Sequence, residues 1–109
     1  MAEKGLVVLS TAAETEVARN LAAMLVKERL AACANVVDGI HSVYWWEGEV
    51  RSDAEVLLII KTDADHLERL TAALEQHHPY DCPEVIALPV VGGSAAYLDW
   101  LRQSLDRSD

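Results

Sequence analysis

Two adjacent histidines, His77 and His78, are the side chains in this sequence best suited to bind a metal ion. Imidazole, alone or with a thiolate, is a ligand for copper and zinc. Adjacent side chains on a regular helix diverge by about 100°, so both rings could share one ion only if Pro79 unwinds the last turn or a third ligand contributes. Cys33 or Cys82 could supply that ligand. The alternative is structural, because imidazoles at a helix C-terminus can satisfy free carbonyl groups.

A second group of polar side chains lies around the same segment. Lys61 ends an apolar strand and Glu84 begins the next one, so the two could form an ion pair. Together with His78 and Tyr80 they could line a cleft at one end of the sheet, which would bind a small anion or a partner protein. The structural alternative is an ion pair beside a packed tyrosine.

The composition is that of a soluble globular chain, and we expect residues 1–109 to form one domain. The formal net charge of −9 repels phosphates and disfavours a nucleic-acid partner. The apolar run near the N-terminus is too short for a signal peptide or a membrane span, so we expect a cytoplasmic protein without a membrane partner. Cys33 and Cys82 are expected to be free thiols in a reducing compartment.

Hydrophobic periodicity predicts the order β-α-β-β-α-β followed by a C-terminal helix. The strands are expected over residues 5–10, 32–47, 51–62 and 84–90. Right-handed crossovers turn this order into an α+β, ferredoxin-like sandwich with one sheet and helices on one face. The second and third strands form a long hairpin, with a bulge at Asp38-Gly39 and a turn at residues 47–49. Pro89 places the fourth strand at an edge or a bulge.

Turn and capping residues predict the helix boundaries. Thr11 with Glu14 fits a capping box for a first helix that runs to about Leu30. Thr62 or Asp63 caps the second helix. Pro79 ends that helix, and Ser94 caps the last one.

The predicted hairpin is too long for the helices that should cover it. About 16 residues of strand span roughly 50 Å, whereas a helix of about 17 residues covers only roughly 25 Å. The projecting part carries Trp45 and Trp46, which point to opposite faces. We therefore expect a closed homo-oligomer in which the hairpins pair edge to edge with neighbouring sheets and other subunits cover these rings. The alternative is a hairpin that bends back over its own sheet.

Several functional classes lack their signatures. The strand EVLLIIKT has no aromatic side chain for stacking on RNA, and the chain has no CxxC loop or phosphate-binding glycine loop. A cysteine–histidine nucleophile pair would need a third orienting group, and none is evident. We therefore expect that the protein is not an enzyme.

Four segments carry a resemblance to a known family: RLAACANV (29–36), SVYWWEGEV (42–50), IIKT (59–62) and HHPYDCPEVIALPV (77–90). With the final YLDWL (97–101), the sequence resembles the CutA family of divalent-cation tolerance proteins over nearly its whole length. The resemblance implies a ferredoxin-like homotrimer with interlocking hairpins, related to the PII-type signalling proteins. It also implies binding of copper(II) or another divalent metal ion, and no catalytic residues.

The family copper site places its two histidines at His77 and His78 and its cysteine at Ser10. A hydroxyl is a poor copper ligand beside a thiolate, so the affinity should fall, or the site should use Cys33, Cys82 or solvent. The candidate metal ligands are therefore His77, His78 and Cys33, and the protein could also be purified without bound metal.

Two functions follow from these residues and this resemblance. The first is a metal-ion-binding protein of divalent-cation tolerance and homeostasis. The alternative is a trimeric PII-like sensor or scaffold that binds a small molecule or a partner protein at intersubunit clefts near Lys61, Tyr80 and Glu84.

Overall fold

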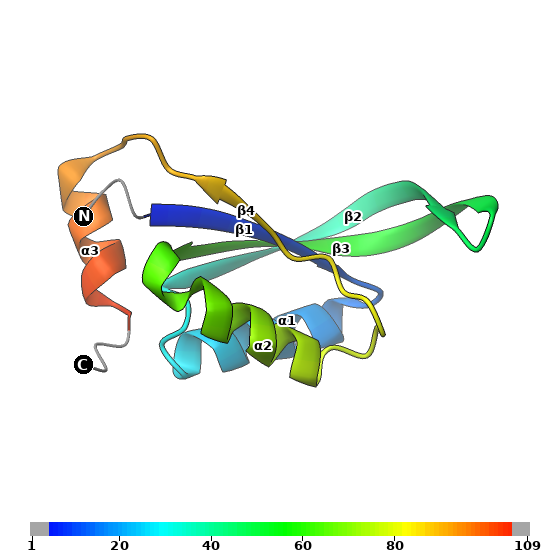
Figure 1. The fold of residues 1–109 in the computed structure, drawn as a ribbon, viewed down its shortest axis with the longest axis horizontal. Coiled ribbons are helices and arrows are strands. Elements are labelled where there is room, and N and C mark those ends of the chain that lie inside the picture. Colours follow the sequence, from blue (N-terminus) through cyan, green and yellow to red (C-terminus); the bar gives the residue numbers. More distant parts are fainter. Residues whose placement is uncertain (1–4, 106–109) are drawn as a thin grey trace.

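The computed structural model describes residues 5–105, which form a four-stranded antiparallel sheet and three α-helices (Figure 1). The elements are β1 (Gly5–Ala12), α1 (Thr15–Lys27), β2 (Cys33–Trp46), β3 (Glu49–Asp63), the 3-10 helix η2 (Ala64–His66), α2 (Leu67–His77), β4 (Ile86–Pro89) and α3 (Ala95–Gln103). The strands lie in the order β2-β3-β1-β4. The predicted α+β, ferredoxin-like fold is confirmed, and Pro89 lies in an edge strand as expected. None of the helices within residues 5–105 is long and apolar enough to cross a membrane.

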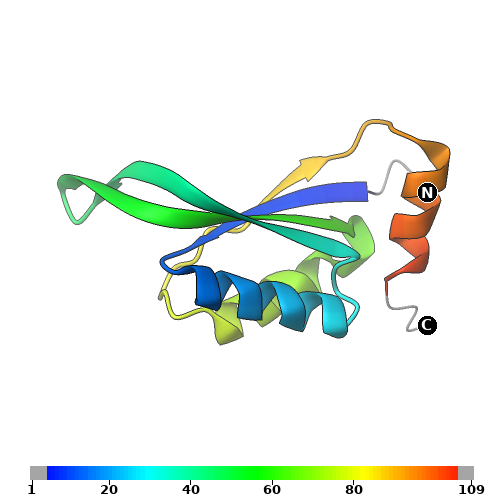
Figure 2. The same ribbon diagram turned by 180° about the vertical axis from the view of Figure 1, so that it is seen from behind.

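Helices α1 and α2 lie side by side on one face of the sheet and bury its core (Figures 1 and 2). Alternate residues of the two central strands point toward them, including Val8, Leu58 and Ile60, which are fully buried. The helices contribute Leu25 and Leu70 to the same cluster. The apolar stripes at helical spacing therefore form this core.

The other face of the sheet is also apolar but has no such cover. Ile86 and Leu88 of β4 are 51% and 47% exposed, and Val37 of β2 is 38% exposed. Helix α3 packs only at one end of the sheet, where Leu101 and Leu105 form a small cluster with Ala32. An antiparallel sheet with one free face normally carries polar side chains there, so this open face is suited to contact a further layer of protein.

The long hairpin projects beyond both helices, as its length predicted (Figure 1). Pairing of β1 with β3 stops at Ala12 opposite Val56, so β2 alone pairs the start of β3. We call residues 40–55 the hairpin arm; its Trp45 is 73% exposed. The register shifts between Val37 and Ile40, which confirms the bulge at Gly39. The alternative of a hairpin folded back over its own sheet is wrong.

The arm ends in a two-residue turn at Glu47 and Gly48. Both residues have positive φ, at 51° and 78°. This combination is typical of a type I′ turn, whose twist matches that of the two strands it joins. The turn-like character predicted for this segment is confirmed.

Several boundaries differ from the prediction. The capping box of Thr11 with Glu14 is wrong, because β1 continues to Ala12 and Glu14 is an N-cap without a side-chain hydrogen bond. Helix α1 ends at Lys27, shortly before Arg29 adopts a positive φ of 59°. Strand β4 begins at Ile86, two residues later than expected. Thr11 is thereby free to contribute to the open face instead of a helix terminus.

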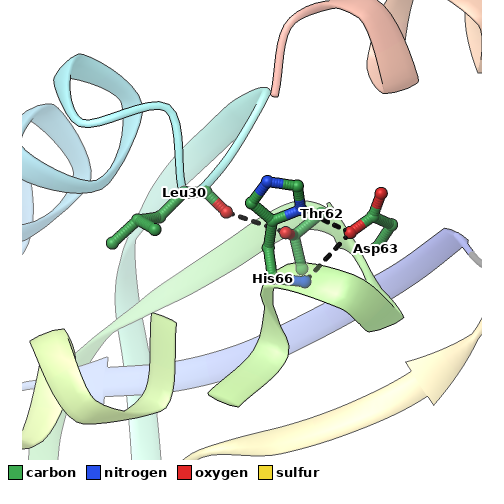
Figure 3. A network of polar contacts seen from close by, with 4 residues as sticks. All are labelled: Leu30, Thr62, Asp63 and His66. Carbon is green, nitrogen blue, oxygen red and sulfur yellow. Dashed lines mark hydrogen bonds and ion pairs between the residues drawn. The ribbon is translucent and has the colours of Figure 1, made fainter. Parts of the chain in front are cut away.

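Figure 3 shows the polar contacts that fix the start of the second helical segment and hold the α1–β2 loop. The Asp63 carboxylate accepts the His66 amide at 3.1 Å and contacts His66 Nδ1 at 2.6 Å, which confirms Asp63 as a cap. The buried Thr62 hydroxyl donates to the Leu30 carbonyl at 2.7 Å. This bond ties the loop after α1 to the end of β3.

Ser10 is also buried and polar but, unlike Thr62, has no hydrogen bond for its hydroxyl in the part of the chain that the structure describes. Its side chain is fully buried, and Oγ has no hydrogen-bond partner among the described residues. Burial of a hydroxyl costs free energy because its hydrogen bonds to water are lost, and without a partner in the protein nothing replaces them. We predict that Ser10→Ala raises the free energy of unfolding by about 1 kcal/mol, measured by urea unfolding at one fixed protein concentration.

The control is Thr62→Val, which also removes a buried hydroxyl from a strand but leaves the Leu30 carbonyl unpaired. The free energy of unfolding of this variant should fall by about 1–3 kcal/mol. A destabilised Ser10→Ala variant would show that the Ser10 hydroxyl has a partner in solution.

Candidate functional site

His78 is held in place by hydrogen bonds at both ring nitrogens. Helix α2 ends at His77, and His78 is extended, as expected for the residue before a proline. Its Nδ1 accepts the Tyr80 amide at 3.0 Å, so the proton lies on Nε2, which donates to the Thr11 carbonyl at 2.7 Å. The ring is 7% exposed and stacks at a tilt on Tyr80, with the centroids 4.6 Å apart. His78 therefore has no free lone pair for a metal ion in this conformation.

His77 has the opposite environment, although it is the adjacent residue. Its ring is exposed, and Nδ1 donates to the Ala73 carbonyl at 3.0 Å. Within residues 5–105, Nε2 makes no hydrogen bond, so its lone pair is accessible. Beside the ring is a hollow of about 290 Å³, lined also by Met24 and Asn20. The His77 imidazole is therefore open to solvent rather than packed toward the sheet.

Cys33 lies far from the two histidines. It pairs with Lys61, whereas Thr11, the partner of His78, pairs with Leu57, four residues or ~13 Å along β3. The Lys61 ammonium lies 3.8 Å from Cys33 Sγ. A single chain therefore does not bring the three predicted ligands together. Across residues 5–105 there is also no group of three or more His, Cys, Asp or Glu side chains that could hold a metal ion.

Tyr97 of α3 is a further neighbour of Cys33. Partial burial of the phenol, and then the neighbouring Cys33 thiol, raise the pKa of Tyr97 above its ordinary value. Lys61 also donates to Asn35 of β2. Cys33 thus belongs to a polar group at the α3 end of the sheet.

A larger cavity, of about 610 Å³, lies on the open face between the hairpin arm and the loop after α2. We call it the arm cleft. It is lined by Thr11, Ser42, Val43, Tyr44, Trp46, Arg51, Glu55, Tyr80, Asp81, Cys82 and Glu84. Four residues were predicted to line one cleft: Lys61, His78, Tyr80 and Glu84. The structure brings Tyr80 and Glu84 together in the lining, and His78 lies behind it with its ring against Tyr80. Lys61 lies elsewhere and contacts Cys33 and Asn35, so its predicted ion pair with Glu84 is wrong.

Two tyrosines connect the walls of the arm cleft to carboxylates of β3. The Tyr80 hydroxyl donates to Glu55 Oε2 at 2.7 Å and so ties the loop after α2 to the arm. The Tyr44 hydroxyl donates to Asp53. Burial, and then the hydrogen bond to Glu55, raise the pKa of Tyr80 above its ordinary value. The hydrogen bond to Asp53 is the main cause of the raised pKa of Tyr44. Both phenols are therefore protonated donors at neutral pH.

The residues of the arm that line the cleft were missed in the sequence. Ser42, Tyr44 and Trp46 on β2, and Arg51 and Glu55 on β3, recur at even spacing on one face of the ribbon. This period-two pattern could have grouped them. What could not be foreseen is that the loop after α2 crosses to the same face, because the backbone of His78 and its two contacts set that path.

Comparisons with known proteins agree on one family. A sequence model of CutA1, described as a divalent ion tolerance protein, matches residues 6–104. A rice (Oryza sativa subsp. japonica) protein named CutA 1, chloroplastic, is 52% identical over 103 residues, or 94% of this chain and 58% of that protein. The chain thus spans little more than half the length of this plant relative. The divalent-cation tolerance protein CutA of Thermus thermophilus is 49% identical over 98 residues, or 90% of this chain and 95% of that protein.

Solved structures show the same likeness. The crystal structure of CutA1 from Oryza sativa superposes with a TM-score of 0.93 at 50% sequence identity, and the match covers 96% of each chain. The structure of the Thermus thermophilus protein gives a TM-score of 0.92 at 47% identity, over 94% of this chain and 99% of that chain.

The two histidines should differ in what they contribute to stability. His78→Ala leaves the Thr11 carbonyl and the Tyr80 amide without partners. We predict a loss of about 2 kcal/mol in the free energy of unfolding. His77→Ala removes an exposed ring and should change it by less than about 0.5 kcal/mol. Thermal unfolding of both variants at equal concentration tests this difference, and equal effects would contradict the structural role assigned to His78.

Proposed function

The chain belongs to the CutA1 family of divalent ion tolerance proteins, and we propose that it is a non-enzymatic homotrimer that binds copper or another divalent cation through His77. The names of the family and of the Thermus thermophilus relative describe tolerance to divalent ions, and neither name states an enzymatic activity. The observation that carries the proposal is the environment of the His77 ring.

A metal-binding imidazole usually donates its second ring N–H to a carbonyl or carboxylate, which fixes the tautomer and orients the ring. His77 has this arrangement: Nδ1 donates to the Ala73 carbonyl, and Nε2 presents its lone pair at the surface. His78, by contrast, uses both nitrogens within the protein. The proposal therefore assigns the ion to the first histidine of the pair and a structural role to the second.

The remaining donors would come from the hollow beside His77 and from water. Met24 lines this hollow, and its thioether is a soft ligand that favours Cu(I). Asn20 offers an amide oxygen on the same wall. Ser10 is fully buried, and Cys33 of the same chain lies toward the other end of the sheet. Because few protein donors lie near His77, we expect a weak site with exchangeable metal rather than a closed site.

Two features support association of several chains. The open face of the sheet carries half-exposed Ile86 and Leu88, and the arm carries the exposed Trp45. If the arm of one chain covers the open face of the next, two different surfaces meet. Such a head-to-tail contact generates a ring when it closes, and three chains make the smallest ring beyond a pair. Burial of both surfaces would then stabilise the trimer.

A second function is favoured by the arm cleft. Its volume of about 610 Å³ lies within the range of small-molecule sites. Its position along the arm would place it beside a subunit interface in the proposed trimer. We therefore propose, as the alternative function, a trimeric sensor or scaffold that binds a small molecule in this cleft.

The proposed location is the cytoplasm. Cys33 and Cys82 are both free thiols. Free thiols persist in a reducing compartment, which supports this location.

Copper titration of the untagged protein tests the assignment to His77. We predict that His77→Ala weakens Cu(II) binding about tenfold or more, because the accessible imidazole is lost. His41→Ala is the matched control, since His41 is an exposed histidine on the arm and its removal should leave the affinity unchanged. Calorimetry supplies the dissociation constants. Unaltered binding by His77→Ala would remove this residue from the proposal.

Met24→Leu separates the thioether from the imidazole. The variant keeps a similar apolar volume, so the fold should be preserved. We expect weaker binding of Cu(I) under reducing conditions and little change for Zn²⁺, since thioethers prefer soft ions. Equal losses for both ions would indicate a change in the shape of the hollow rather than a lost ligand.

Light scattering tests the assembly. Chains of 12.0 kDa should give a species of three times that mass at micromolar concentration. Trp45→Glu should promote dissociation, because it places a charge in the proposed interface. Val91→Glu is the control, since Val91 is 98% exposed in a loop outside the arm. A native species of 12.0 kDa would contradict the trimer.

A further inference from the structure

The arm cleft combines aromatic walls with an excess of carboxylates. The rings belong to Tyr44, Trp46 and Tyr80, and the carboxylates to Glu55, Asp81 and Glu84. Arg51 supplies the one cationic side chain of the lining, and its guanidinium lies 3.6 Å from the Glu47 carboxylate at the turn. The cleft therefore presents a net negative surface to a ligand.

The charged groups of the cleft walls are mainly acceptors, since three carboxylates accompany one guanidinium. The Tyr80 and Tyr44 hydroxyls donate to Glu55 and Asp53, so both phenol protons are already directed at carboxylates. The hydrogen bond to Asp53 is the main cause of the raised pKa of Tyr44, whereas burial is the first cause of the raised pKa of Tyr80, followed by the hydrogen bond to Glu55. A ligand would meet carboxylate oxygens that can still accept hydrogen bonds. The anion expected from the sequence depended on Lys61, which does not line this cleft.

The carboxylates are spread over the cleft rather than gathered around one point. Glu55 comes from the arm, and Asp81 and Glu84 come from the loop after α2. Within residues 5–105, these side chains do not form a group of three that could hold a metal ion. Separated charges on both sides of an aromatic-lined cavity match an extended ligand better than a single ion.

We propose that the arm cleft binds a small organic cation of the aliphatic amine class. The ammonium groups would lie against Glu55 and Glu84, where charge-assisted hydrogen bonds are strong. The carbon chain would lie along Tyr44, Trp46 and Tyr80, whose faces also attract cations. This inference rests on the alternative function proposed above and names its ligand class. It is independent of the metal ion assigned to His77.

Three four-carbon probes of different charge test the ligand class: putrescine, 1,4-butanediol and succinate. We expect putrescine to bind, with perturbation of the Trp46 indole signal in NMR spectra of the trimer. Butanediol and succinate should bind about tenfold more weakly or not at all, since they lack the charge that the carboxylates select. The titrations should be done at physiological ionic strength, because salt screens the long-range electrostatic attraction of a cation to the negatively charged protein.

Two substitutions and a control test the position of the site. Glu84→Gln and Glu55→Gln should each weaken putrescine binding about tenfold. Glu84 serves as the second variant because Glu55→Gln also alters the bond from Tyr80. Glu75→Gln removes the same charge from the exposed surface of α2 and should leave the affinity unchanged.

The outcomes separate this inference from the proposed function. Succinate binding in the cleft, with no binding of putrescine, would keep a small-molecule site but overturn the cationic class. Equal losses in Glu75→Gln and Glu84→Gln would show general attraction by the negative chain and also overturn the inference. An intact trimer that binds none of the three probes would overturn the amine site alone. A protein that stays monomeric would instead remove the proposed assembly.

Discussion

The sheet has apolar side chains on both faces, while the two long helices cover only one. This imbalance governs much of the rest of the structure. On the covered face, Val8, Leu58 and Ile60 are buried against α1 and α2. On the other face, Ile86 and Leu88 remain half exposed, and the arm extends past the last residue of β1 with a single neighbouring strand. A two-stranded ribbon with exposed tryptophan is marginal in water by itself. The fold of one chain thus leaves apolar surfaces exposed, and the proposed assembly would cover them.

The short segment after α2 converts this architecture into two separate chemical sites. His78 bonds the Thr11 carbonyl and the Tyr80 amide, which fixes where the chain leaves the helix side and crosses the end of β1. Tyr80 then reaches Glu55 on the arm and closes one wall of the arm cleft. His77, one residue earlier, stays on the helix and presents its ring at the surface. Of these two neighbouring histidines, His78 therefore fixes the path of the chain, whereas His77 presents an accessible imidazole.

Much of the fold could be predicted from local chemistry. Hydrophobic periodicity identified the helices and strands. Gly39 indicated the bulge in β2, and Ser94 and Asp63 indicated the helix caps. The exceptions depend on tertiary contacts: pairing opposite Leu57 drew Thr11 into β1 instead of a helix cap. The site was less predictable. Sequence spacing suggested that Lys61 and Glu84 would meet, but β3 and β4 flank β1 from opposite sides and carry them to different ends. Spacing also could not decide which histidine of the pair is buried, because that depends on the extended backbone before Pro79.

Strand β4 has a consequence for how far the sheet can grow. It is only four residues long, lies at an edge and contains Pro89, which lacks an amide hydrogen. A foreign strand therefore finds few donors along this border, while the opposite border, on β2, offers a much longer row. Addition of a strand is thus less favourable at the β4 border than at the β2 border. The short β4 edge therefore disfavours the growth of fibres by strand addition, although the chain has exposed apolar surfaces.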